Sequence, residues 1–206
     1  MTSVSIPLFP LNTVLFPDGM LPLQIFEVRY LDMINKCIAN GTQFGVVSLT
    51  HGSEVRKPGA TETIAAVGTM ARIAESEAPM PGLLHIVCNG TARFHVSASE
   101  QLKHGLWMAE VTPIDADQVV DIPAELQNTA DALGKLIASL QGEGLPSTEM
   151  PIIPPYRLDE CGWVANRWSE LLPLPTGQKQ RLLELDNPML RLELIQDALV
   201  EQGLLG

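Results

Sequence analysis

Four histidines are the side chains best suited to metal binding or acid–base chemistry, and two of them lie near each other in the sequence. His85 and His95 flank Asn89-Gly90, a dipeptide typical of a hairpin turn because it tolerates positive φ. If this dipeptide forms a two-residue loop, the cross-strand pairing places the two imidazoles on opposite sheet faces. Imidazoles that point apart cannot share one zinc ion, so we predict no metal site here. His51 and His104 stand beside glycines and are interpreted as loop residues.

Carboxylates and thiols give no better metal or disulfide pattern. Asp115, Asp117 and Asp121 fall where the chain changes character, and a calcium loop would need a denser set of oxygen ligands with a glycine at the bend. The cysteines are odd in number, widely separated and never form a CxxC pair: they are Cys37, Cys88 and Cys161. We interpret them as buried thiols, and we expect neither a metal nor a cofactor.

The common catalytic signatures are missing from the sequence. It contains no phosphate-binding G-x-x-x-x-G-K-[ST], no G-x-G-x-x-G, no G-x-S-x-G, no S-x-x-K and no H-E-x-x-H. We therefore expect a non-enzymatic protein. The alternative is a cryptic hydrolase with a site between the two halves of the chain that uses His85 or His95.

Composition and charge restrict the partners. The chain has 206 residues, of which 46% are hydrophobic and 18% charged, as in a packed globular protein. A formal net charge of -11 would repel phosphate backbones, so we expect no nucleic acid partner. No apolar run approaches the length of a membrane span and no basic leader precedes an apolar core, so we expect a cytoplasmic protein with no membrane contact.

The first half of the chain reads as strands. Apolar residues alternate over residues 67–73, 84–88 and 94–96, and further strands are predicted at 45–49 and 107–112. One helix is predicted over residues 27–39, with Tyr30, Ile34 and Ile38 on one face and Asn40-Gly41 as its stop. Together these elements predict a mostly antiparallel sheet, curled into a barrel, with one embedded helix.

The second half reads as helices. Apolar residues recur at helical spacing over residues 126–140, with Asp121 as N-cap, and again over 164–171 and 176–185. A fourth helix is predicted to begin at Pro188 with Asn187 as its N-cap. The fold class is therefore α+β, with a sheet domain over residues 1–117 and a helical bundle over residues 118–206.

Residues 6–30 carry four prolines and end in a charged, aromatic cluster. The prolines exclude a helix, and Asp18-Gly19 predicts a tight turn between short strands at 14–16 and 21–23. The cluster lies where the chain enters the first helix. We expect it to form a packed, hydrogen-bonded corner that holds this helix to the sheet: its members are Phe26, Glu27, Arg29 and Tyr30.

The same segment resembles the N-terminal domain of the ATP-dependent Lon proteases, which also occurs in stand-alone Lon-domain proteins. The most specific element is Ile25-Phe26-Glu27-Val28-Arg29-Tyr30, followed by Phe44-Gly45-Val46-Val47. The resemblance continues through residues 68–73, 90–94 and 109–111 and, more weakly, through residues 171–174 and 179–185. It therefore extends over nearly the whole chain.

The resemblance implies a bacterial-type, PUA-like barrel followed by a helical bundle, used to recognise unfolded or hydrophobic protein segments. It also implies work beside a separate ATP-dependent protease or chaperone, because the phosphate loop and the serine–lysine peptidase of full-length Lon are expected to be absent. RNA binding is the alternative that PUA-like barrels suggest, and weak association of the chain with itself stays open. The candidate peptide-binding residues are Leu21, Leu23, Met80, Pro81, Met150, Ile152, Ile153 and Tyr156.

Overall fold

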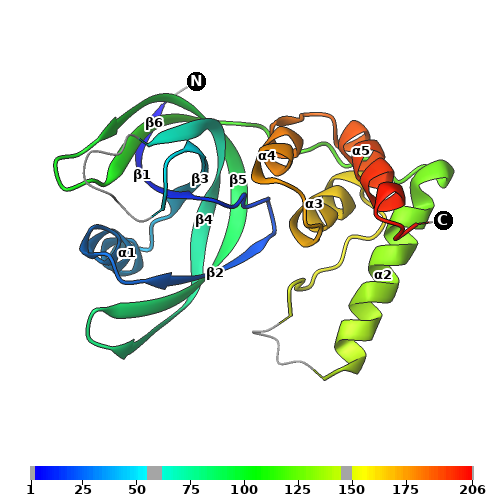
Figure 1. Cartoon of the computed structure of the whole chain (residues 1–206), viewed down its shortest axis with the longest axis horizontal. Helices are drawn as coiled ribbons and strands as arrows, with labels where there is room; N and C mark the ends of the chain where they lie inside the picture. Colours follow the sequence, from blue (N-terminus) through cyan, green and yellow to red (C-terminus); the bar gives the residue numbers. More distant parts are fainter. Residues whose placement is uncertain (1–2, 55–61, 145–149, 206) are drawn as a thin grey trace. The chain divides into compact units, whose positions relative to one another are not determined.

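The computed structural model describes residues 3–54, 62–144 and 150–205, which form two compact units (Figure 1). The first unit contains the chain up to Ala116 together with Pro175–Leu183. The second contains Asp117–Leu174 and the chain from Glu184 onward. The sequence placed everything after residue 117 in one helical domain, whereas Pro175–Leu183 groups with the sheet.

The first unit is built on a curled sheet of six strands. They are β1 (Val4–Leu11), β2 (Met20–Ile25), β3 (Phe44–His51), β4 (Thr63–Met80), β5 (Leu83–Gln101) and β6 (Trp107–Pro113). Their order is β2-β5-β4-β3-β1-β6, and the second half of β5 also pairs with β6, so five strands form a closed ring of pairings. β1 and β3 run parallel, and the remaining pairings of the described strands are antiparallel. The predicted α+β fold with a mostly antiparallel, curled sheet is confirmed.

Alternation of side chains along the strands builds the core of this unit. Val67, Thr69 and Ala71 of β4 are buried, as are Leu84 and Ile86 of β5. Because successive strand residues point to opposite faces, this period of two gives each strand one apolar face. These residues belong to the core of the unit, as the sequence predicted.

The dipeptide Asn89-Gly90 is not a turn, and that prediction was wrong. β5 continues through it, and the chain reverses instead at Pro81 and Gly82, where Gly82 has φ +81°. A Cβ at position 90 would lie 2.1 Å from the carbonyl oxygen of Phe16. Gly90 is therefore required because a neighbouring segment approaches the strand closely, and not because of its own φ.

The segment before β2 is buried without being a strand. Residues 14–16 were predicted as a strand but adopt irregular structure, although all three are buried. Their backbone is held by contacts to the sheet: the Thr69 hydroxyl donates to the carbonyl of Leu15 at 2.6 Å. The predicted turn at Asp18-Gly19 is present, with Asp18 at φ +61°.

Helix α1 (Val28–Asn40) ends as predicted, with Gly41 in the left-handed conformation at φ +64°. Its buried face differs in part from the predicted one. Tyr30 and Ile34 are buried, but Ile38 is 42% exposed. Cys37 takes the place of Ile38 on the buried face, because the residue three positions after Ile34 points more directly at the core here.

Helix α4 (Thr176–Glu184) contacts the sheet through polar groups. The hydroxyl of Ser48 donates to Oε1 of Gln180 at 2.7 Å, and Nε2 of Gln180 donates to the carbonyl of Val67 at 3.0 Å. Nη1 of Arg93 donates to the carbonyl of Leu183 at 2.8 Å. These buried hydrogen bonds explain why this helix groups with the first unit.

The second unit consists of helices. A short 3-10 turn, η1 (Ala124–Leu126), leads into α2 (Gln127–Gly142), followed by α3 (Cys161–Leu171) and α5 (Pro188–Glu201). Asp121 does not cap α2 as predicted, because it forms an isolated β-bridge with Glu160. Asn187 does cap α5: its Oδ1 accepts from the amides of Met189 and Leu190. No helix in the described ranges has both the length and the hydropathy to cross a bilayer.

Candidate functional site

Part of β4 and β5 extends beyond the ring of strands. The pairing of β3 with β4 stops at Phe44 and Ala71, whereas β4 and β5 stay paired up to Met80 and Leu83. β2 pairs with the same part of β5. We call this three-stranded extension, formed by β2 with residues 75–80 and 83–87, the ribbon; Figure 1 shows its β4–β5 hairpin reaching beyond the body of the sheet.

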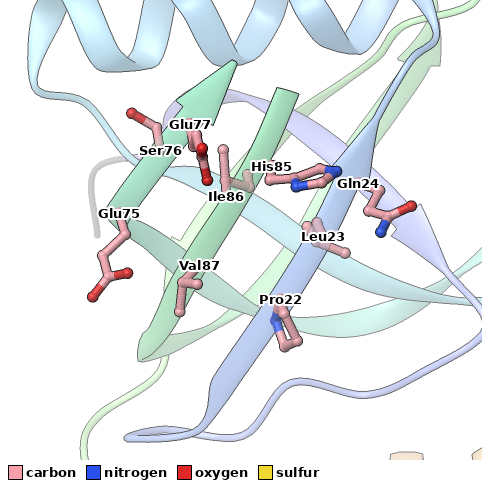
Figure 2. Close-up of a pocket in the computed structure, with 9 residues that line it drawn as sticks. All are labelled: Pro22, Leu23, Gln24, Glu75, Ser76, Glu77, His85, Ile86 and Val87. Carbon is pink, nitrogen blue, oxygen red and sulfur yellow. The ribbon is translucent and has the colours of Figure 1, made fainter. Parts of the chain in front are cut away.

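One face of the ribbon is open to solvent and hollow. Gln24, His85 and Glu77 form one cross-strand row, and Pro22, Val87 and Glu75 form the next row on the same face. They border a hollow of about 420 Å³ (Figure 2). Figure 2 shows His85 extending from β5 toward Gln24, while Glu75 points outward from β4.

The opposite face of the ribbon belongs to the core. Ile25, Leu84 and Ile86 are buried there, and Leu21 and Leu23 are partly buried against the same cluster. These two leucines, predicted to contact peptide, therefore give much of their surface to the core. Of the two, Leu23 also borders the hollow.

Exposed apolar side chains gather at the end of the ribbon. β2 ends at Ile25 opposite Leu84, and Leu83 pairs with Met80, so Phe26 and Met80 lie at the same end. Each is 59% exposed, and Pro81 beside Met80 is exposed as well. We call these three residues the ribbon tip. Phe26 was expected in a packed corner and is not: the chain turns from strand to helix here with the Phe26 side chain toward solvent.

The rest of the corner does hold the first helix to the sheet. Nε of Arg29 lies 3.0 Å from Oε2 of Glu27, and Nη1 donates to the carbonyl of Gly105 at 2.6 Å. The guanidinium carbon lies 4.5 Å from the ring centroid of Tyr30, which itself is 4.0 Å from the ring of Phe9. Burial raises the pKa of the Tyr30 phenol, so it stays neutral. This buried network fixes the backbone that carries Phe26.

A second hollow, of about 580 Å³, lies between α1 and the turn that joins β5 to β6. Its lining is mixed in charge, with Lys36 and His104 beside Asp32. Arg29 also lines it, but its donors are already directed at Glu27 and Gly105. We take the hollow on the ribbon as the candidate site, because the exposed apolar residues of the ribbon tip lie at the end of the same strands.

The remaining predicted contact residues lie in the second unit. Met150 and Ile152 are buried, with 7% and 2% exposure, and so offer no surface to a ligand. Ile153 and Tyr156 are half-buried, and the Tyr156 hydroxyl accepts from Nε2 of Gln141 at 3.1 Å. Residues 145–149 of the same connection lie outside the described residues.

The ribbon offers contact surface and negative charge. Within the described ranges, no three histidine, cysteine, aspartate or glutamate side chains gather as a metal site. The described thiols are all buried, and burial raises the pKa of Cys88 to about 12. Sequence reasoning overlooked Glu75, Glu77 and His85 as neighbours, although the alternation of Glu75, Ser76 and Glu77 in a strand was a usable signal.

Comparison with known proteins gives a consistent result. Residues 5–201 match the family described as the ATP-dependent protease La (LON) substrate-binding domain. A crystal structure of a Lon N-terminal domain protein from Xanthomonas campestris is 32% identical, with a TM-score of 0.73 over 94% of this chain and 98% of that one. The N-terminal domain of the Mycobacterium avium complex Lon protease has the same fold, at 21% identity and a TM-score of 0.60 over 94% of this chain and 97% of that one.

Curated relatives are longer than this chain. A Lon protease of Anaeromyxobacter dehalogenans is 28% identical over 198 residues, which are 94% of this chain but 23% of that protein. A second, Lon protease 2 of Myxococcus xanthus, is 26% identical over 94% of this chain and 23% of its own length. The chain thus spans less than a quarter of these relatives, within the part that the family description calls substrate-binding. It belongs to the family of Lon substrate-binding domains.

Proposed function

We propose that this chain binds extended, apolar segments of unfolded proteins and makes no covalent change to them. The observation that carries the proposal is the ribbon tip, where Phe26 and Met80 are each 59% exposed beside a hollow of about 420 Å³. Exposed apolar groups gathered beside a concave surface are typical of binding sites. The substrate-binding description of the family supports the same function.

The physical character of the tip suits many different clients. A methionine side chain is flexible and polarisable and can adapt to apolar groups of different shapes. Phe26 contributes a large rigid surface on backbone that the Arg29 network holds in place. A fixed aromatic beside an adaptable methionine favours affinity for apolar residues without strict selection of sequence.

We further propose that the chain acts in the cytoplasm and delivers bound segments to a separate ATP-dependent protease or chaperone. The matched relatives are named Lon proteases, and the region matched is their substrate-binding part. A domain that binds clients without cutting them would need such a partner for the client to be degraded or refolded.

The test uses a fluorescently labelled protein that is kept unfolded by reduction and by alkylation of its thiols with a neutral reagent. Fluorescence anisotropy of the label then measures how tightly this unfolded protein binds to the chain. We expect saturable binding that weakens roughly tenfold in a Phe26→Ser and Met80→Ser double variant, because two apolar contacts are removed. The matched control is Val4→Ser, a change at another exposed apolar residue of the same unit, with 54% exposure.

Two results would contradict the proposal. The first is that the unaltered chain binds no unfolded protein under conditions in which circular dichroism shows it to be folded. The second is that Val4→Ser weakens binding as much as the tip variant, because this would mean that the tip has no special part in the interaction.

A further inference from the structure

The outer half of β4 is a strand with one open edge. Residues 74–80 are all exposed, and in the described part of the chain they pair with β5 alone. The outward backbone N–H and C=O groups of residues 74–78 therefore have no described strand beside them, whereas Pro79 has no N–H to offer. Such an edge is a template on which an extended peptide can add as a further strand.

The charged side chains within residues 74–80 are Glu75 and Glu77, both negative, and the nearest basic residue of the strand is Arg72, three residues before Glu75. Glu75 and Glu77 lie on the same face as the hollow, and in the residues described neither makes an ion pair. None of the described residues lining the hollow is a lysine or arginine. Placing another negative charge beside these glutamates would be unfavourable, whereas placing an ammonium or guanidinium group there would be favourable.

The same charges disfavour a second copy of this chain as the occupant. An antiparallel pairing of two such edges about Ser76 would place Glu75 of one copy opposite Glu77 of the other. Like charges directly opposite each other across a strand pair are destabilising. A chain with a formal net charge of -11 also adds long-range repulsion between copies.

We infer that the open edge of β4 takes a segment of extended chain that carries lysine or arginine at alternate positions, with its basic side chains facing Glu75 and Glu77. Because the two glutamates are two residues apart on one face, the matching basic residues are also two apart. Apolar residues at the end of the same segment then lie beside Met80, the β4 residue of the ribbon tip. This inference rests on the proposed function and names the class of segment preferred.

The experiment compares two labelled nine-residue peptides with the same apolar residues, one with two lysines at alternate positions and one with two glutamines there. We expect the lysine peptide to bind about fivefold more tightly at low salt, as two exposed ion pairs allow. The preference should shrink in 0.5 M salt, since ions screen exposed charges. A Glu75→Gln and Glu77→Gln double variant should bind both peptides alike.

The matched control is a Glu100→Gln and Glu110→Gln double variant. It removes the same charge from two exposed strand residues elsewhere in the unit and should keep the lysine preference. Hydrogen exchange provides a second readout: the amides of residues 75–77 should exchange more slowly with the lysine peptide bound, because an added strand covers the edge.

The possible results separate the inference from the proposed function. Equal binding of both peptides by the unaltered chain, equal loss in the two double variants, or unchanged exchange at residues 75–77 would each overturn the inference and leave the proposed function standing. If the chain bound neither peptide and also failed to bind the unfolded protein used above, the inference and the proposed function would both be overturned.

Discussion

Replacement of Gly90 by alanine tests whether a close approach of backbone fixes the position of β2. The added Cβ would lie 2.1 Å from the carbonyl oxygen of Phe16 and 3.1 Å from Cγ of Leu15. Because real Cβ atoms do not approach other atoms within 3.0 Å, the Phe16 carbonyl must move by at least about 0.9 Å. Phe16 is fully buried, so there is little room for this movement.

The cost follows from the hydrogen bonds on either side of the contact. The Gly90 amide donates to the carbonyl of Gly19 at 2.8 Å, and the Asp18 amide donates to the carbonyl of Gly90 at 3.0 Å. Loss of both bonds with incomplete solvation of the freed groups costs about 2 to 4 kcal/mol. With a urea slope of about 2 kcal/mol per M, the unfolding midpoint of the first unit should fall by about 1 to 2 M.

Urea unfolding followed by circular dichroism measures this shift, and hydrogen exchange locates it. We expect faster exchange of the amides of β2 in Gly90→Ala, since the segment before β2 loses its attachment to β5. The matched control is Gly134→Ala, inside α2, where the new Cβ would meet Leu158 at an ordinary 3.4 Å. That variant should be more stable by up to about 1 kcal/mol, because alanine favours helix. An unchanged midpoint in Gly90→Ala would refute the steric reasoning.

Two further predictions concern buried polar groups. Arg191 is 1% exposed and donates to Oδ2 of Asp117 at 2.5 Å and to Oδ1 of Asn166 at 3.0 Å. Arg191→Met should therefore lower the free energy of unfolding, measured in urea, by about 3 kcal/mol, because the half-buried Asp117 carboxylate loses this ion pair. Arg191→Lys should recover part of this loss. A methionine variant as stable as the unaltered chain would contradict this. Burial raises the pKa of Cys88 from 9.0 to about 12, so the unfolded chain loses this proton first and the free energy of unfolding falls as pH rises above 9. Between pH 9 and 10, the free energy of unfolding should fall by about 1 kcal/mol less in Cys88→Ala than in the unaltered chain. An equal fall in both proteins would argue against a buried neutral thiol.

Local signals in the sequence predicted the elements whose boundaries depend on one or two residues. Asn40-Gly41 ends α1 and Asn187-Pro188 begins α5, because a left-handed glycine and a side-chain cap act within a single turn. Asn89-Gly90 shows the limit of such signals. Glycine is needed both where φ is positive and where another backbone comes close, and sequence alone does not tell the two apart.

Features that depend on contacts between residues far apart in the sequence were harder to predict, because no local pattern specifies such contacts. Helix α4 has the pattern of a bundle helix, but its place with the sheet is determined by hydrogen bonds from Gln180 to residues more than a hundred positions away. At the candidate site, Met80 was predicted because a methionine side chain can repack against apolar groups of different shapes. Glu75 and Glu77 were overlooked because their importance depends on strand register, which the misplaced hairpin turn had obscured.

In the first unit the ring provides stability and the ribbon provides the proposed binding surface, and this separation follows from the lengths of β4 and β5. In the described strands, pairing around the ring covers backbone groups on both sides, so the ring supplies stability and leaves little edge for another chain. β4 and β5 have 18 and 19 residues, far more than the ring needs, and the excess forms the ribbon with its open edge and exposed tip. A binding surface placed on this excess can change its side chains without disturbing the core. Substitutions at Glu75, Glu77 and Met80 should therefore alter binding with little effect on the free energy of unfolding. A substitution at Gly90, where the ribbon joins the ring, should instead lower the free energy of unfolding before it alters binding.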